Sequence, residues 1–162
     1  MHQGKALYAG ISSYSARRTK EAAASLGGLG TRLLIHQPSY SMLNRWIEDD
    51  VLGPKGRRAG RRSRKPSRLF LHRAADGRNL EKVRALHRIA ERRGQTLAQM
   101  AIAWTLRNPA VTSALVDASS LAQLEQNVTA LERLDFSSDE LREIDRHATE
   151  SGINLWAASS AG

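Results

Sequence analysis

The residues best suited to chemistry are short polar side chains that follow a run of mostly apolar residues late in the chain. Residues 111–116 predict a buried strand, and the turn after it leads into a helix that starts at Leu121. Ser120 and Gln123 have the spacing of a capping box. A helix start presents backbone N–H groups and the positive end of a dipole, which favours a phosphate. The sequence therefore predicts a place where a nucleotide cofactor can bind.

The first third of the chain has the pattern of two strands joined by a helix. Residues 6–11 and 31–35 predict short buried strands. Between them, Ser15 is a suitable N-cap for a helix over 16–26, and Gly27–Gly28 is expected to stop it. The order strand, helix, strand indicates a parallel βαβ unit.

Helical periodicity governs the sequence after residue 79. Thr96 with Gln99 and Ser137 with Glu140 predict two further capping boxes, and Asn108–Pro109 is expected to halt the helix that Thr96 begins. The residues expected to face inward are Leu80, Val83, Leu86, His87 and Ala90, then Leu97, Met100, Ala101 and Trp104, then Leu141, Ile144 and Ala148, while Leu121, Leu124, Val128 and Leu131 share one face.

Composition limits the class of protein. A chain of 162 residues without cysteine fits one domain with neither disulfides nor thiolate chemistry. It has no apolar run long enough to span a membrane and no signal-peptide pattern, so a cytoplasmic location is expected. The histidines lack metal-ligand spacing, so no metal site is predicted; those considered are His36, His72, His87 and His147.

The net charge of +9 comes from one segment. Nine of the 25 Lys and Arg residues lie within 55–73, and 51–75 holds none of the 16 acidic residues. Residues 48–78 show neither the apolar periodicity of a helix nor that of a strand. We therefore expect this segment to be disordered, between ordered parts at 1–47 and 79–162. Its arginines can contact nucleic-acid phosphates, but Phe70 is the only aromatic nearby for base stacking, which argues against such an interface.

Five stretches carry a resemblance to a known family: residues 4–15, 34–40, 93–104, 111–131 and 154–160. In this order and spacing they resemble the C-terminal half of the aldo-keto reductases, NADPH-dependent carbonyl reductases built on a (β/α)8 barrel. The similarity is to the branch that holds bacterial L-glyceraldehyde 3-phosphate reductases and potassium-channel β subunits. The resemblance implies an α/β fold, a partial (β/α)8 TIM barrel made of the C-terminal half, with the penultimate strand lost.

The resemblance also implies two groups of cofactor-binding residues. Strand-end residues are expected to hold the nicotinamide carboxamide, which needs both a donor and an acceptor. Helix-start residues are expected at the adenosine end. The first group is Ser12, Ser13 and Gln37; the second is Ser119 at the adenosine phosphate, with Gln123, Gln126 and Asn127 beside it.

Asp117 stands where the family has a glycine. A carboxylate there repels the 2′-phosphate of NADPH, by about 1 kcal/mol or more at contact range. It can instead accept a hydrogen bond from the free 2′-hydroxyl of NADH. The expected cofactor is therefore NADPH, with NADH made possible by Asp117.

The family's catalytic aspartate, tyrosine, lysine and histidine come from its first four strands, and this chain begins near the fifth. No catalytic residue is expected here, so the resemblance implies an NADP(H)-dependent reductase of aldehydes or ketones that is truncated and inactive alone. Unpaired strands would favour self-association or a complementing N-terminal half. Two alternatives stay open: a non-catalytic nucleotide-binding or regulatory module, and a basic protein that binds nucleic acid through 55–73.

Overall fold

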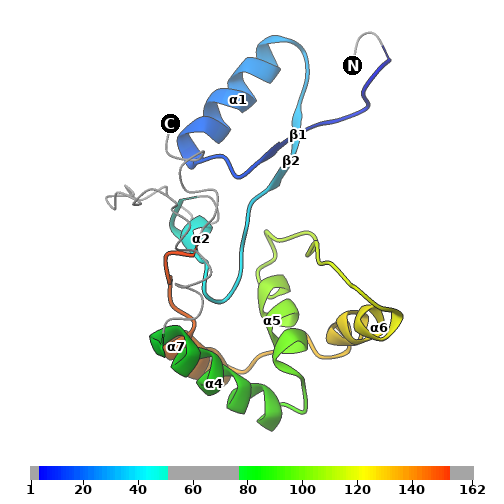
Figure 1. The fold of residues 1–162 in the computed structure, drawn as a ribbon. Helices are drawn as coiled ribbons and strands as arrows, with labels where there is room; N and C mark the ends of the chain where they lie inside the picture. The colour runs from blue at the N-terminus through cyan, green and yellow to red at the C-terminus, as the bar shows by residue number, and fades with distance from the viewer. Residues whose placement is uncertain (1–3, 51–76, 154–162) are drawn as a thin grey trace. The chain divides into compact units, whose positions relative to one another are not determined.

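The computed structural model describes residues 4–50 and 77–153, which belong to two compact units (Figure 1). The first unit holds the described residues 4–40 and 46–50, and the second holds 41–45 and 77–153. Most of residues 48–78, which the sequence predicts to be disordered, and the stretch 154–160 of the resemblance lie outside the described residues. In the part that is described, no helix is both long and apolar enough to cross a membrane.

The first unit is built around two parallel strands, as the sequence predicts. Ser12 pairs with Gln37 and Ile11 with His36, so the carboxyl ends of both strands lie at one edge. The helix between the strands contacts the second of them. The elements are β1 (Ala9–Ser12), α1 (Ala16–Gly28), β2 (Leu33–Gln37) and α2 (Trp46–Asp50).

Helix α1 begins where expected and ends later than expected. Ser15 accepts a hydrogen bond from the Arg18 N–H at 3.4 Å and forms the predicted N-cap. The helix ends at Gly28, within the glycine pair expected to stop it and two residues beyond the expected last residue, Leu26. The left-handed residue that turns the chain is Gly30, with φ of 68°.

The second unit is a cluster of helices. Helix α4 packs against α7 and α5, and α5 also contacts α6 and the short helix η1 (Figure 1). Met100, Trp104 and Ile144 are fully buried at its centre. The elements are α4 (Gly77–Arg92), α5 (Leu97–Leu106), α6 (Leu121–Thr129), η1 (Ala130–Glu132) and α7 (Ser138–His147).

Two of the predicted capping boxes are confirmed in full. Thr96 and Gln99 each accept a backbone N–H of the other at the start of α5, and Ser137 and Glu140 do the same at the start of α7. Each box satisfies two N–H groups that a helix start leaves without a partner.

The expected inward face of α4 is wrong in part. Leu86 and Ala90 are buried, but Leu80 is 45% exposed and the His87 side chain is 55% exposed. Ala85 and Ile89 are buried instead, because the helix contacts two neighbours and its buried arc is shifted by one residue.

The expected buried strand over 111–116 is also wrong. These residues have no regular secondary structure, and Leu115 is 79% exposed. A strand needs a neighbour to share its hydrogen bonds, and in the described residues β1 and β2 pair with each other. The apolar face expected for the next helix is likewise exposed, at Leu121, Leu124 and Val128 of α6 and at Leu131 of η1.

Candidate functional site

The predicted strand-end residues lie together at the carboxyl edge of the two strands. The Ser12 hydroxyl donates to the Gln37 carbonyl at 3.1 Å, and the Ser13 N–H approaches the same carbonyl at 3.3 Å. Ser13 is buried, whereas Gln37 is exposed. Gln37 therefore contributes its backbone to the fold and presents its side chain at the surface.

The turn after β1 is held by a residue that sequence reasoning considered only as a metal ligand. The Nε2 atom of His36 accepts a hydrogen bond from the Tyr14 N–H at 3.1 Å. Burial lowers the pKa of His36 below its usual 6.5. The signal in the sequence was its place beside Gln37, at the end of a strand parallel to β1.

The predicted helix-start residues surround the turn before α6. The Ser120 hydroxyl accepts a hydrogen bond from the Gln123 N–H at 3.2 Å. In a full capping box the Gln123 side chain would also accept the Ser120 N–H, but here it binds Ser119 instead. The Gln123 side-chain oxygen accepts from the Ser119 N–H at 2.7 Å and from the Ser119 hydroxyl at 2.9 Å. The predicted Ser120–Gln123 box is therefore only half formed, because the adjacent serine takes the glutamine side chain.

Asn127 and Asp117 close the same turn. The Asn127 side chain donates to the Asp117 carbonyl at 3.3 Å. One carboxylate oxygen of Asp117 accepts from the Ala118 N–H at 2.8 Å. The structure thus brings Ser119, Gln123 and Asn127 together through hydrogen bonds that involve the residues just before the helix.

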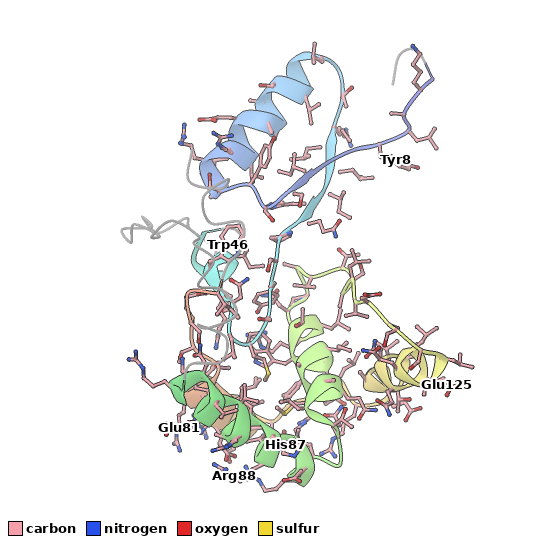
Figure 2. The ribbon with its side chains drawn as sticks, viewed as in Figure 1. Tyr8, Trp46, Glu81, His87, Arg88 and Glu125 are labelled. Atoms are coloured by element: carbon pink, nitrogen blue, oxygen red, sulfur yellow. The ribbon has the colours of Figure 1, made fainter. Side chains whose placement is uncertain are left out.

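Gln126 is not part of this network. Its backbone carbonyl accepts a hydrogen bond from the Gln99 side chain at 3.3 Å, which ties α6 to the start of α5. The Gln126 side chain is exposed, next to Glu125, which is labelled in Figure 2.

The start of α6 offers donors to an anion. In the described part of the chain, the N–H groups of Leu121 and Ala122 have no backbone acceptor, as expected for a first helical turn. The exposed carboxylate of Asp117 lies in the turn that precedes them. The helix start can hold a phosphate, and the nearby negative charge opposes a second one.

Other kinds of site are poorly supported. Residues 4–50 and 77–153 contain no group of three or more possible metal-ligating side chains. A shallow cavity of about 510 Å³ in the second unit includes none of the predicted site residues. It is lined by Arg107, Asn108, Pro109, Leu134, Asp135, Phe136 and Leu141.

A family model places the chain among known proteins. The model of the Aldo/keto reductase family matches residues 50–149, more than half of the chain. The chain belongs to the aldo/keto reductase family. The resemblance stated from the sequence motifs is therefore confirmed.

The curated relatives include L-glyceraldehyde 3-phosphate reductases from two strains of Escherichia coli. They are 40% and 39% identical over 189 residues, covering 99% of this chain and 54% of each relative. The chain thus spans about half the length of these relatives. A protein of Schizosaccharomyces pombe, named for a voltage-gated potassium channel subunit beta, is 43% identical over 67 residues, 41% of this chain and 20% of that one.

A solved structure shares the fold. It is a thermostable aldo-keto reductase in complex with the inhibitor epalrestat, with a TM-score of 0.62 and 23% identity. The likeness covers 90% of this chain and 50% of that one. At this identity the likeness shows the fold alone, which is α/β, with an open sheet of two parallel strands in the described residues.

Proposed function

We propose that the chain supplies the cofactor-binding half of a nicotinamide-dependent aldo-keto reductase that acts on a small aldehyde or ketone in the cytoplasm. One observation carries this proposal beyond family membership. Ser12, Ser13 and Gln37 meet at the carboxyl edge of parallel strands, which is where barrel enzymes bind their ligands.

The strand-end group suits the nicotinamide end of the cofactor. A carboxamide has one acceptor oxygen and two N–H donors, and a glutamine amide offers the complementary set. Gln37 is exposed, and the bonds from Ser12 and Ser13 go to its backbone carbonyl, which leaves its side-chain amide for the cofactor. When bound, a reduced nicotinamide supplies the hydride that reduces a carbonyl carbon.

The helix-start group suits the adenosine end. The N–H groups of Leu121 and Ala122 can bind one phosphate, and the Ser119 hydroxyl becomes a donor to it if Gln123 turns away. Gln123 and Asn127 are then placed to contact the adenosine, and Gln126 has a weaker claim. NADPH is the family's expected cofactor, while the Asp117 carboxylate favours NADH.

The lengths of the relatives support a partial barrel. The alignment to them extends over 189 residues, more than the 162 of this chain, so they carry residues without a counterpart here. We interpret the chain as the C-terminal half of a (β/α)8 barrel that lacks the penultimate strand. The family's proton-transfer residues belong to the other half, so this chain alone should bind cofactor without turnover.

The name of the Escherichia coli relatives indicates a substrate class. L-glyceraldehyde 3-phosphate is a small phosphorylated aldehyde, and we propose an aldehyde of this kind as substrate once the other half of the barrel is supplied.

Cofactor titration of the full chain tests the proposal. NADPH and NADH fluorescence is followed on mixing with the purified, folded protein, and saturable binding is expected. Ser119→Ala and Gln37→Leu should each weaken binding about 3- to 10-fold, the worth of one hydrogen bond. Ser138→Ala changes an exposed serine at the start of α7 and should leave binding unchanged. A folded protein that binds neither cofactor contradicts the proposal.

A second candidate function is a non-catalytic regulatory module, favoured by the match to the channel-named protein. The two functions differ in one result. The E. coli L-glyceraldehyde 3-phosphate reductase residues upstream of the matched half can be co-expressed with this chain. Reduction of glyceraldehyde 3-phosphate by the pair supports the reductase half, and bound cofactor without any turnover supports the module.

A further inference from the structure

Three hydrogen bonds tie the end of β1 to the end of β2, and only one of them uses a side-chain acceptor. Ser12 and Ser13 donate to the same backbone carbonyl, that of Gln37. Tyr14 instead donates its N–H to the imidazole Nε2 of His36, at 3.1 Å. The third bond therefore depends on the identity and charge of one side chain.

The residue between these bonds has a strained backbone. Ser13 has φ of 53°, the only positive value for a residue other than glycine in the described parts of the chain. Left-handed backbone costs a non-glycine residue roughly 1–2 kcal/mol, so neighbouring contacts must hold it. The Ser13 N–H is bound on one side and the Tyr14 N–H on the other, and this pair of bonds fixes the turn.

The bond to Tyr14 requires a neutral imidazole. A nitrogen that accepts has no proton, so the proton of His36 resides on Nδ1. Nδ1 is shielded from solvent and has no partner among the described residues. Burial lowers the pKa of His36, which keeps the ring in the accepting form at neutral pH.

The surroundings of His36 carry few titratable groups in the described residues. Strand β1, which pairs with β2, has none within Ala9–Ser12. Tyr14 follows β1 and Tyr40 follows β2. Helix α1, which contacts β2, carries the charged residues Arg17, Arg18, Lys20 and Glu21, of which Arg17 and Glu21 form an ion pair.

We infer that His36 is a positioning residue for the nicotinamide end of the site. Through the Tyr14 N–H it holds Ser13 in the left-handed turn, and so sets the edge at which Ser12, Ser13 and Gln37 face the carboxamide. The inference rests on the proposed function. It adds that protonation of one imidazole weakens cofactor binding without any contact between that imidazole and the cofactor.

Two substitutions in the full chain separate the acceptor from the bulk of the ring. In His36→Gln, the amide oxygen can replace Nε2 as acceptor, whereas His36→Leu fills the space without an acceptor. Binding is measured from pH 8 to pH 5.5 by quenching of tryptophan fluorescence with NADP⁺, which is stable in acid. Exchange of the Tyr14 amide hydrogen is measured in parallel without cofactor.

At pH 8, His36→Leu should weaken NADP⁺ binding about 3- to 10-fold and speed exchange of the Tyr14 amide, while His36→Gln stays within about twofold of the wild type. Below pH 6.5 the wild type should lose affinity as the ring becomes protonated, and His36→Gln should not. If His36→Leu fails to fold, the pH profiles of the wild type and His36→Gln still show whether protonation of His36 weakens NADP⁺ binding.

Equal affinity and equal Tyr14 exchange in all three proteins would overturn the inference. A wild type that binds no NADP⁺ contradicts the proposed function, and with it the role of His36 in binding. Exchange at Tyr14 then still shows whether His36 holds the turn, so the two failures are distinguishable.

Discussion

The two units differ in how much of their packing the described residues provide. In the second unit, Met100, Trp104 and Ile144 are fully buried, and they lie on α5 and α7, both of which contact α4. In the first unit, α1 buries none of its residues, and β2 leaves Leu34 and Ile35 exposed by 62% and 57%. The helical unit has a core of its own, whereas the strands lack cover, and an isolated pair of strands is marginal in water.

A buried arginine adds to the contrast. Arg93 is 2% exposed and forms an ion pair with Glu140 at 2.5 Å. It also donates to the Asp135 carbonyl at 2.8 Å and lies 3.9 Å from the centre of the Phe136 ring. One side chain thus joins the end of α4 to the start of α7. No charged residue is comparably buried among residues 4–40 and 46–48 of the first unit.

Exposed apolar residues gather where the sequence predicted barrel strands and the helix that follows the last strand. They include Leu7 and Tyr8 before β1, Leu34 and Ile35 in β2, and Leu115 and Val116 in the expected strand. Isolated exposed apolar residues are normal, but a series of them on strands indicates missing neighbours. The first unit therefore lacks the packing that strands obtain from other strands, and the second unit, which packs locally through its helices, lacks it at Leu115 and Val116.

The largest expected effect comes from removing the central side chain of the second unit. Trp104 is fully buried, with the Arg107 guanidinium 3.6 Å and the Arg45 guanidinium 5.0 Å from its ring centre. Trp104→Ala should lower the free energy of unfolding by about 3–5 kcal/mol. Urea unfolding followed by circular dichroism measures the loss, and hydrogen exchange by mass spectrometry assigns it to segments.

Exchange should rise in α4, α5 and α7 and stay unchanged in β1 and β2. Leu115→Ala, at a position 79% exposed, is the control and should have little effect. If Trp104→Ala raises exchange equally in both units, the chain unfolds as one cooperative body and the comparison fails.

An intermediate effect is expected within the first unit, from two glycines with opposite results. A Cβ atom on Gly10 would lie 2.6 Å from the Ile35 Cγ2 and 3.3 Å from the Ile35 carbonyl oxygen, so Gly10→Ala should destabilise the strand pair by about 1–3 kcal/mol. Gly28→Ala meets nothing within 4 Å in the last turn of α1 and should stabilise by about 0.5–1 kcal/mol. Thermal unfolding measures the stability of both variants, and hydrogen exchange in β1 and β2 reports on the strand pair. If Gly10→Ala left the stability unchanged, the two strands would not pair closely.

Local signals in the sequence were enough to predict the starts of α1, α5, α6 and α7 and the parallel strand pair, but not α2 or the start of α4 at Gly77. A capping box is decided within four residues, so Thr96–Gln99 and Ser137–Glu140 needed no tertiary information. Ser120–Gln123 shows the limit of such signals. Two adjacent serines compete for one glutamine, and spacing alone does not say which of them binds it.

Features that depend on distant residues were not predictable in this way. A strand at 111–116 depends on its neighbours, and the buried face of α4 depends on how α5 and α7 lie against it. In the candidate site, the order strand, helix, strand was enough to bring Ser12 and Gln37 together. The role of His36 was missed because a hydrogen bond from a backbone N–H leaves no motif.

The smallest expected effect is on the pH dependence of the second unit's stability, through the ion pair of Glu140 with the buried Arg93. Burial alone would raise the pKa of Glu140, but hydrogen bonds from Ser137 and Arg93, together with the Arg93 charge, hold it below the usual 4.5. Its contribution to the stability of the second unit is therefore complete above pH 4.5 and is lost as pH falls through the lowered pKa. We expect a loss of about 1 kcal/mol, since the side chain is partly exposed.

Urea unfolding from pH 7 to pH 3 should show a shallower pH dependence in Glu140→Gln than in the wild type. The control is Glu143→Gln, on the same helix as Glu140. It removes an exposed ion pair between Glu143 and Arg92 of α4 and should keep the wild-type dependence of stability on pH. If both variants change the profile alike, the buried Arg93 gives Glu140 no special role, and the second unit owes its stability to its apolar core alone.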